Sequence, residues 1–317
     1  MDQVTLGRTG LQVSVVGLGC GGQSRLGQSK GATESASIDV VRAALDLGIT
    51  LVDTAQLYGT EEIVGKALAG RRDEVVLSTK APPDDRGKPI SARHLRKGLE
   101  ASLKRLRTDR VELFFLHGVQ VQHLDHVRTT LVPELVKQRD AGKLRHVAVS
   151  EAFMSDRGHA ALVELLDAGD DWFDVAMVGF NLLNPSARDR VLTATQARGI
   201  GVLDMFAVRQ ALVSAAGVLE VVDGLVERGE LPVGAVDRED PLGFLLRGDG
   251  AAASLIDAAY RFARHEPGVD VVLTGTGSID HLHQNAASIT SGPLRPDDLA
   301  QLTDLFGQVD TVTGDLR

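Results

Sequence analysis

In VVGLGCGG, residues 15–22, Gly17, Gly19 and Gly22 have the GxGxxG spacing of a dinucleotide-binding turn. That spacing indicates a doubly wound sheet only when the glycines follow a strand, open a helix and precede an acidic residue by about 20 positions. The apolar residues before Gly17 satisfy the first condition. The segment after Gly22, QSRLGQSKGAT, has the composition of a loop, and the next acidic residue at a strand end, Asp53, lies far beyond that window. We therefore interpret the stretch as a glycine-rich strand end that passes close to something else.

Short apolar runs of the buried-strand type alternate with helical stretches along the chain. The eight runs are Val13–Leu18, Thr50–Asp53, Val75–Ser78, Val111–Leu116, Val147–Val149, Val175–Val178, Val202–Leu203 and Val271–Leu273. The helical stretches are Ser35–Leu47, Glu61–Leu68, Ala92–Leu106, Val127–Ala141, Asp156–Leu166, Ala187–Ala197, Ala252–Arg264 and Asp280–Ile289. Eight alternations without a linker predict an α/β fold, a single (β/α)8 barrel of the TIM type over residues 1–317, with a doubly wound sheet as the alternative.

Three segments lie outside this repeat. VTLGRTGLQV, residues 4–13, predicts a short β-hairpin before the barrel, and the residues after Arg295 predict an extra C-terminal helix. The longest insertion runs from Leu219 to Asp249. A long insertion in a barrel is either a lid or substrate loop or a solvated connection, and the sequence favours neither.

Composition and charge exclude several classes of protein. A net charge of −9 over 317 residues argues against nucleic acid or an anionic membrane as the main partner, because both need a basic face. Without a signal-peptide pattern or a run of about 18 apolar residues, we expect a cytoplasmic protein. The single cysteine, Cys20, excludes an internal disulfide. We predict no metal site, because the pairs His123 with His126 and His281 with His283 lack a third ligand at suitable spacing and are expected at the surface.

Complementary ionisable groups follow three consecutive predicted strands. Asp53 ends the second strand and Tyr58 follows it in LVDTAQLYG, Lys80 ends the third in VVLSTK, and His117 ends the fourth in ELFFLHG. Each alone has an ordinary structural explanation, such as a turn cap or a packed core residue. Because the carboxyl ends of barrel strands meet at one face, we expect the four side chains to converge there as a catalytic site.

These motifs together resemble the aldo-keto reductase family. The resemblance extends from LGRTGLQVSVVGLGCGG through LRHVAVSE, GFNLLNP and RGIGVLDM to VVLTGTGSIDHLHQN near the end of the chain. It implies an NAD(P)H-dependent oxidoreductase that reduces an aldehyde or ketone, or oxidises the matching alcohol or sugar hemiacetal, with Tyr58 as general acid and base. Lys80 would lower the pKa of Tyr58, Asp53 would hold Lys80, and His117 would orient the carbonyl oxygen.

The resemblance also implies where the nicotinamide lies. The backbone around Gly21 would border it, and Ser150 would bind its carboxamide beside Glu151, which stands where the family has Asn. Met177 stands where the family has Gln, and Met205 where an aromatic residue stacks on the ring. Glu151 can only accept hydrogen bonds when ionised, so Glu151→Asn should tighten cofactor binding if this side chain faces the carboxamide.

GTGSIDHLHQN, residues 275–285, resembles the segment that holds the adenosine phosphate. The implied cofactor-binding residues here are Gly275, Thr276, Gly277, Ser278, His281, Gln284 and Asn285. The segment lacks Lys and Arg, which would pair with a 2′-phosphate. The resemblance to the family favours NADP(H), whereas the missing cations favour tolerance of NADH, so we favour NADP(H) weakly and keep NAD(H) as plausible.

Two further functional classes stay open. Altered carboxamide residues would suit a catalytically weakened dinucleotide-binding barrel that serves as a regulatory or interaction subunit. Lys80 could instead form a Schiff base in a metal-free lyase or isomerase. The sequence names neither the small-molecule carbonyl or sugar substrate nor the oligomeric state.

Overall fold

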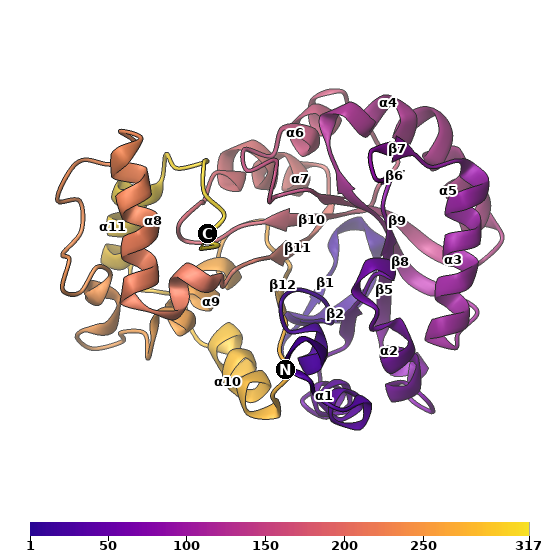
Figure 1. The fold of residues 1–317 in the computed structure, drawn as a ribbon, viewed down its shortest axis with the longest axis horizontal. Helices are drawn as coiled ribbons and strands as arrows, with labels where there is room; N and C mark the ends of the chain where they lie inside the picture. Colours follow the sequence, from indigo (N-terminus) through magenta and orange to yellow (C-terminus); the bar gives the residue numbers. More distant parts are fainter. Residues whose placement is uncertain (317) are drawn as a thin grey trace.

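The computed structural model describes residues 1–316. Within these residues eight parallel strands close into a barrel in the order β10-β11-β12-β3-β4-β5-β8-β9 (Figure 1). The strands are β3 (Val16–Gly19), β4 (Leu51–Asp53), β5 (Val76–Ala81), β8 (Val111–Val119), β9 (Leu144–Glu151), β10 (Val175–Gly179), β11 (Gly201–Met205) and β12 (Val271–Thr274). The predicted (β/α)8 barrel is confirmed, and closure rules out the open doubly wound sheet.

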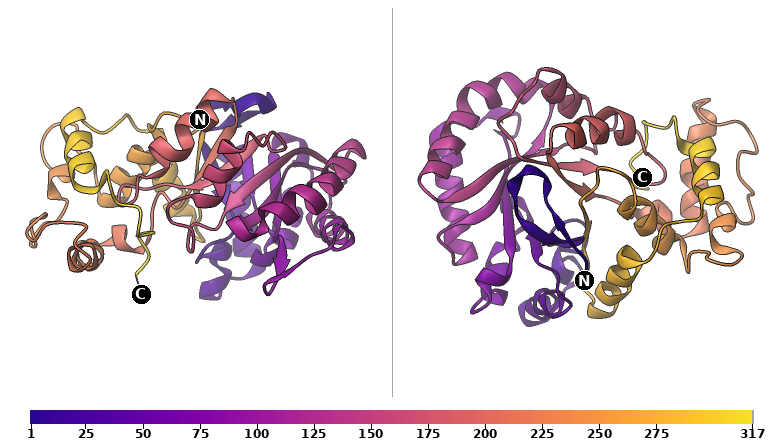
Figure 2. Two further views of the ribbon diagram at one scale, coloured as in Figure 1. Left: turned by 90° about the horizontal axis from the view of Figure 1, so that it is seen from above. Right: turned by 180° about the vertical axis from the view of Figure 1, so that it is seen from behind.

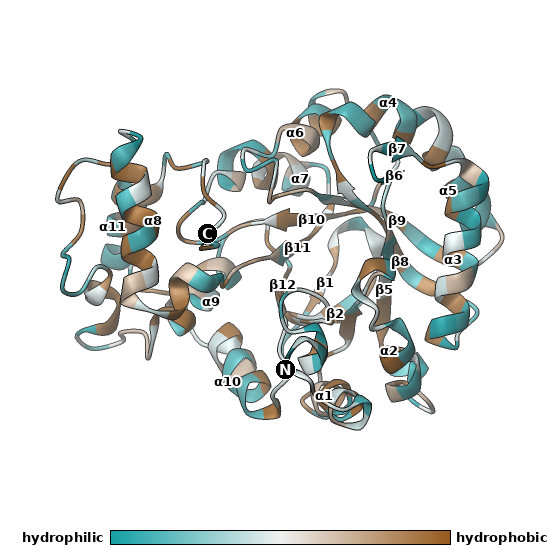
Figure 3. Cartoon of the chain, in the orientation of Figure 1, coloured by the Kyte–Doolittle hydropathy of each residue, from teal (hydrophilic) through white to brown (hydrophobic). Residues whose placement is uncertain are grey.

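Helices cover the outside of this barrel. They are α1 (Glu34–Asp46), α2 (Glu61–Ala67), α3 (Ala92–Leu106), α4 (Leu124–His126), α5 (Val132–Asp140), α6 (Ala160–Asp167), α7 (Thr193–Ala197), α9 (Leu255–Arg264) and α10 (Ile279–Thr290). Short π-helical segments, Val127–Leu131 and Arg188–Leu192, precede α5 and α7 inside stretches predicted as single helices. Figure 3 shows the mixed hydrophilic and hydrophobic colouring of helices such as α3, as expected for helices with one buried face.

The glycine-rich opening stretch forms β3 and a loop. Val16 and Leu18 point outward into the core beneath the helices, whereas a Cβ on Gly17 would lie 2.5 Å from the Leu273 side chain inside the barrel. The first long helix, α1, begins only at Glu34, where the Thr33 hydroxyl accepts from the Ala36 amide. The stretch is therefore a barrel strand without the helix that a phosphate-binding turn requires.

A hairpin closes the amino end of the barrel. β1 (Gln3–Thr5) and β2 (Gln12–Ser14) pair antiparallel, and Leu6 and Val13 join the apolar cluster inside the barrel. Figure 2 shows this hairpin lying across the barrel end. The predicted hairpin is confirmed, but Val13 belongs to its second strand and not to the first barrel strand.

The insertion after β11 contains a helix that the sequence interpretation did not predict. α8 (Ala215–Glu227) is capped by Ser214, whose hydroxyl accepts from the Gly217 amide. The helix buries Val218, Val221, Val222 and Leu225 along one face. α8 and the predicted C-terminal helix α11 (Pro296–Phe306) form an outlying layer at the left of Figure 1. Across residues 1–316, no helix is both long and apolar enough to cross a membrane.

Gly7→Ala tests how the hairpin is fitted to the barrel. Gly7 has φ +46°, and an added Cβ would lie 2.2 Å from the Gly201 amide nitrogen, so we expect a loss of about 2–4 kcal/mol of unfolding free energy. Gly10→Ala is the control, because Gly10 also has a positive φ, +70°, but no heavy atom lies within 4 Å of its added Cβ. It should cost about 1 kcal/mol. Equal costs in urea unfolding would contradict the close fit.

Candidate active site

Three of the four predicted catalytic residues point into the barrel at its carboxyl-terminal mouth. Asp53 ends β4, Lys80 lies near the end of β5, and His117 lies near the end of β8. Asp53 and His117 each lie two positions after an inward-facing residue of the inner cluster, Leu51 and Phe115 respectively, and residues two apart on a strand share one face. Parallel neighbours in one barrel therefore bring the three side chains together.

Lys80 and Asp53 form a buried ion pair. Lys80 is 0% exposed and Asp53 is 3% exposed. The ammonium nitrogen lies 2.6 and 2.5 Å from the two carboxylate oxygens and 3.0 Å from the Thr54 carbonyl oxygen. These three acceptors match the three N–H groups of a lysine, which is the condition under which a buried charge is tolerated. Burial opposes the charge on Lys80, but Asp53 and Tyr58 together outweigh burial and raise the Lys80 pKa.

Tyr58 is held over this pair by its own turn. The Lys80 nitrogen lies 5.0 Å from the centre of the Tyr58 ring. A Cβ on Gly21 would lie only 2.4 Å from that ring, so the glycine allows the phenol to pack on the backbone after β3. Arg25 donates from its Nε to the Tyr58 carbonyl oxygen at 2.7 Å. Gly21, whose backbone is predicted to border the nicotinamide, therefore also packs against the ring of Tyr58.

The pKa of Tyr58 corrects one expectation. Burial raises it, and the charge of Lys80 lowers it without cancelling the effect of burial, so the pKa of the phenol stays above its usual value. Lys80 thus acts in the predicted direction, but the net pKa is not lowered. The phenol is protonated at neutral pH and able to donate a hydrogen bond or a proton.

His117 lies edge-on to Tyr58. The ring centres are 5.6 Å apart with an interplanar angle of 88°. Burial and the nearby charge of Lys80 lower the pKa of His117 to about 3, so the imidazole is neutral at pH 7. Its buried Nδ1 has no hydrogen-bond partner within residues 1–316. A neutral imidazole beside a phenol provides a polar contact for an uncharged ligand atom.

The residues predicted to hold the nicotinamide lie around the next three strands. Ser150 is in register with His117 of β8 and with Met177 of β10. Met177 belongs to the apolar cluster inside the barrel, and Met205 packs against it. Their contacts with a cofactor stay predictions.

The predicted phosphate segment forms the turn into α10. Ser278 is the N-cap of this helix, and its hydroxyl accepts from the His281 amide. A Cβ on Gly277 would lie 2.3 Å from the Gly27 Cα, so the loop after β3 covers this turn. Asn285 donates from its side chain to the Thr274 hydroxyl at 2.8 Å, whereas His281 and Gln284 are exposed. The roles of these residues toward a dinucleotide also stay predictions.

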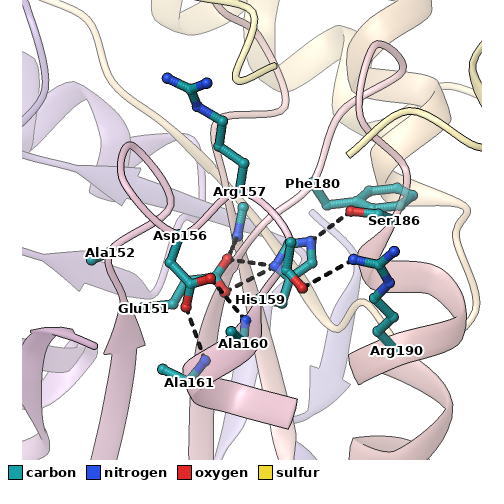
Figure 4. A network of polar contacts seen from close by, with 12 residues as sticks. Glu151, Ala152, Asp156, Arg157, His159, Ala160, Ala161, Phe180, Ser186 and Arg190 are labelled. Carbon is teal, nitrogen blue, oxygen red and sulfur yellow. Dashed lines mark hydrogen bonds and ion pairs between the residues drawn. The ribbon is translucent and has the colours of Figure 1, made fainter. Parts of the chain in front are cut away.

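Glu151 has partners that the sequence did not indicate. It is 3% exposed, so its carboxylate is buried and not solvated. Its carboxylate accepts from the Gly179 amide at 2.6 Å. It also lies 2.9 Å from His159 Nδ1, the contact drawn in Figure 4. His159 adopts φ +63° in an irregular loop, so no helix or strand periodicity could pair it with Glu151. These two partners already use both Glu151 oxygens. A contact between Glu151 and the carboxamide stays a prediction.

The remaining reactive side chains have structural contacts. Cys20 is fully buried, and burial raises the pKa of its thiol. His123 lies 3.2 Å from an Asp84 oxygen and His126 lies 2.8 Å from the Ile90 carbonyl oxygen, and both are half-buried. His281 and His283 are exposed, as expected. No group of three potential metal-ligating side chains occurs in residues 1–316.

The effect of Lys80 on Tyr58 can be measured without substrate. The chain has two tyrosines, so a Tyr260→Phe background leaves Tyr58 as the only phenol. In that background, Asp53→Asn/Lys80→Met should shift tyrosinate formation, followed by ultraviolet absorbance, to higher pH, because Lys80 lowers the Tyr58 pKa more than Asp53 raises it. The double change avoids leaving an unpaired buried carboxylate. An unchanged midpoint, with the fold checked by circular dichroism, would contradict the coupling.

Comparison with known proteins agrees with this arrangement. The sequence profile of the Aldo/keto reductase family matches residues 17–306. L-galactose dehydrogenase of Arabidopsis thaliana is 27% identical over 298 residues, which cover 90% of this chain and 87% of that protein. Aldo-keto reductase YhdN of Bacillus subtilis is 39% identical over 162 residues, 47% of each chain.

A solved structure of an aldo-keto reductase is also similar to this chain. The holo form of aldo-keto reductase AKR11C1 from Bacillus halodurans is 25% identical, with a TM-score of 0.70 and 96% of each chain covered. Members of this family are oxidoreductases that use a nicotinamide cofactor. On the match over residues 17–306, the chain belongs to the aldo/keto reductase family.

Proposed function

We propose that this protein is an NAD(P)H-dependent reductase of aldehydes or ketones, able to oxidise the matching alcohol or sugar hemiacetal in reverse. One observation carries the proposal: a fully buried lysine, saturated by Asp53 and the Thr54 carbonyl, lies against the ring of Tyr58. Burying such a pair opposes folding unless it is fully satisfied. Its placement at the barrel mouth, where barrel enzymes carry their chemistry, supports a catalytic purpose.

Each of the four side chains has a different role in the reduction of the carbonyl group. A bound reduced nicotinamide supplies the hydride for the carbonyl carbon. Tyr58 donates its proton to the carbonyl oxygen, and the charge of Lys80 stabilises the phenolate that remains. Asp53 keeps Lys80 charged and in place. His117, neutral at pH 7, hydrogen-bonds the carbonyl oxygen and orients it without competing as an acid.

The chain has features that fit a dinucleotide. Ser150 faces the barrel interior beside His117, where it can bind the carboxamide. At the same mouth of the barrel, after the end of β12, the amino terminus of the 12-residue helix α10 presents its N–H groups and the positive end of its dipole, which favour an anion. Gly275, Thr276, Gly277 and Ser278 form the turn before that helix, and His281, Gln284 and Asn285 extend from its first turns. We assign the cofactor phosphate and adenosine to this segment.

The competing function is a dinucleotide-binding barrel without turnover. Two observations favour it: Met177 offers no hydrogen bond to a carboxamide, and the Glu151 carboxylate already has two partners. Such a protein would bind the cofactor but reduce no carbonyl compound. The intact set of Tyr58, Lys80, Asp53 and His117 argues for the enzyme.

Tyr58→Phe tests the assignment of the general acid. Loss of its hydroxyl should lower kcat for carbonyl reduction by about 100-fold or more, because no other group donates the proton. The dissociation constant of the reduced cofactor should stay nearly unchanged. The measurement is the absorbance of the reduced nicotinamide over a panel of carbonyl compounds and sugars. Activity within a few fold of the parent would remove Tyr58 from the mechanism, and cofactor binding without turnover in the parent would favour the regulatory alternative.

The preference between NADPH and NADH can be measured as the ratio of their dissociation constants. Residues 275–285 contain no Lys or Arg, Arg209 is paired with Asp315, and Arg238 is paired with Asp223. A charge-assisted contact contributes about 1.5–3 kcal/mol, so without one we expect NADPH to bind no more than about tenfold more tightly than NADH. Titration followed by the fluorescence of the reduced cofactor measures both. A preference of about 100-fold would mean that a cation outside this segment reaches the 2′-phosphate.

A further inference from the structure

Buried carboxylates from both neighbouring strands bind the last amide of β10 and the amide that follows it. The Gly179 N–H donates to Glu151 of β9 at 2.6 Å, and the Phe180 N–H donates to Asp204 of β11 at 3.1 Å. The backbone register between β9 and β10 ends at Ser150 with Met177. The Glu151 side chain therefore continues the connection between these two strands beyond their last paired residues.

The hydrogen bonds around His159 fix one of its protons (Figure 4). The Asn184 amide nitrogen donates to the carbonyl oxygens of Arg157 and Val312, so its oxygen faces Ser186. That oxygen lies 2.6 Å from the Ser186 hydroxyl, which must donate because an amide oxygen only accepts. The Ser186 oxygen, 3.0 Å from His159 Nε2, therefore accepts from that nitrogen. His159 carries a proton on Nε2.

Glu151 and His159 share one further proton. His159 Nδ1 lies 2.9 and 3.1 Å from the two Glu151 oxygens, and both side chains are fully buried. A hydrogen bond at this distance needs one proton between them, so the pair is neutral overall whichever partner holds it. The order Glu, His, Ser resembles a nucleophilic triad, but the Ser186 proton points to Asn184 and not to His159. Ser186 is therefore not poised as a nucleophile.

An aromatic side chain fixes the pair against β10. The Phe153 and His159 rings stack, with centres 5.5 Å apart and an interplanar angle of 18°. Phe153 occupies the space beside Gly179, where an added Cβ would lie 2.3 Å from its ring. It also stacks on Phe206, which follows β11, with centres 6.2 Å apart. The pair thus belongs to one packed unit that spans the ends of β9, β10 and β11.

We propose that the Glu151–His159 pair is a positioning unit that holds the ends of β9 and β10 together and thereby places Ser150 for the nicotinamide. Ser150 precedes Glu151 and faces the barrel interior in register with His117, whereas Glu151 faces the opposite side of the strand, like Val149. Glu151 acts through Ser150 and does not touch the cofactor. The inference rests on the proposed function, because it assumes that a nicotinamide binds at this mouth.

Three variants test the unit by direct titration of NADPH and by kcat at saturating cofactor. Glu151→Ala removes the acceptor of the Gly179 amide and should weaken NADPH binding by about tenfold while kcat stays within about threefold. Glu151→Gln should restore affinity to within about twofold, because its oxygen accepts from Gly179 and its NH2 donates to a neutral His159. Glu112→Ala is the matched control. Glu112 is 4% exposed and likewise accepts from one backbone amide, that of Leu77, and one side chain, that of Arg72, at the other end of the barrel.

The control separates positioning from general stability. Glu112→Ala should lower Tm as much as Glu151→Ala and leave NADPH affinity unchanged. Equal weakening in both variants, or none in Glu151→Ala, would overturn the proposal. Tighter binding by Glu151→Asn would also overturn it, since that result requires a carboxylate facing the carboxamide.

A milder variant covers the case in which Glu151→Ala does not fold. Ser186→Ala leaves the His159 Nε2 proton without an acceptor and should weaken NADPH binding by about threefold. Unchanged affinity would overturn the proposal. A parent protein that binds neither NADPH nor NADH would overturn the proposed function together with this inference, whereas a parent that binds and a Glu151→Ala variant that binds equally well would overturn the inference alone.

Discussion

The ion pair between Lys80 and Asp53 is the interaction on which the proposed site depends. A charged amine without solvent exposure is tolerated only when every N–H has an acceptor, and here β4 supplies the carboxylate and the residue after it supplies a carbonyl. Parallel strands in register bring Asp53 beside Ser78, whose hydroxyl donates to the same carboxylate. Tyr58 then lies over a fixed positive charge, because Gly21 leaves room for its ring.

The two ends of the barrel differ in a way that explains where the chemistry lies. At the amino end, the hairpin places Leu6 and Val13 in the inner cluster and closes the barrel with apolar side chains. At the carboxyl end, strands terminate in buried polar groups that need partners from loops. Burial raises the pKa values of both Glu151 and Asp204 there, and each accepts a backbone N–H from the end of β10. The mouth is thus held by specific polar contacts, which can orient a ligand.

The sequence predicts the barrel and the four converging side chains because both depend on local periodicity. Apolar runs mark the strands, and the residue that follows each run must lie at the mouth. Three features were not predicted. The helix α8 lies in the insertion after β11, which was interpreted as a loop, although Val218, Val222 and Leu225 have helical spacing. The raised pKa of Tyr58 depends on burial, which spacing does not reveal. His159 meets Glu151 only through an irregular loop with a positive φ.

In the proposed mechanism the Tyr58 hydroxyl, beside the charge of Lys80, protonates the carbonyl oxygen. The most direct test compares two pH titrations of one protein, the Tyr260→Phe variant, in which Tyr58 is the only tyrosine. One follows tyrosinate absorbance of the cofactor complex, and the other follows kcat for carbonyl reduction. Since only the protonated phenol can donate, kcat should fall with rising pH along the same curve as tyrosinate formation. A kcat that stays constant while Tyr58 ionises would contradict the account.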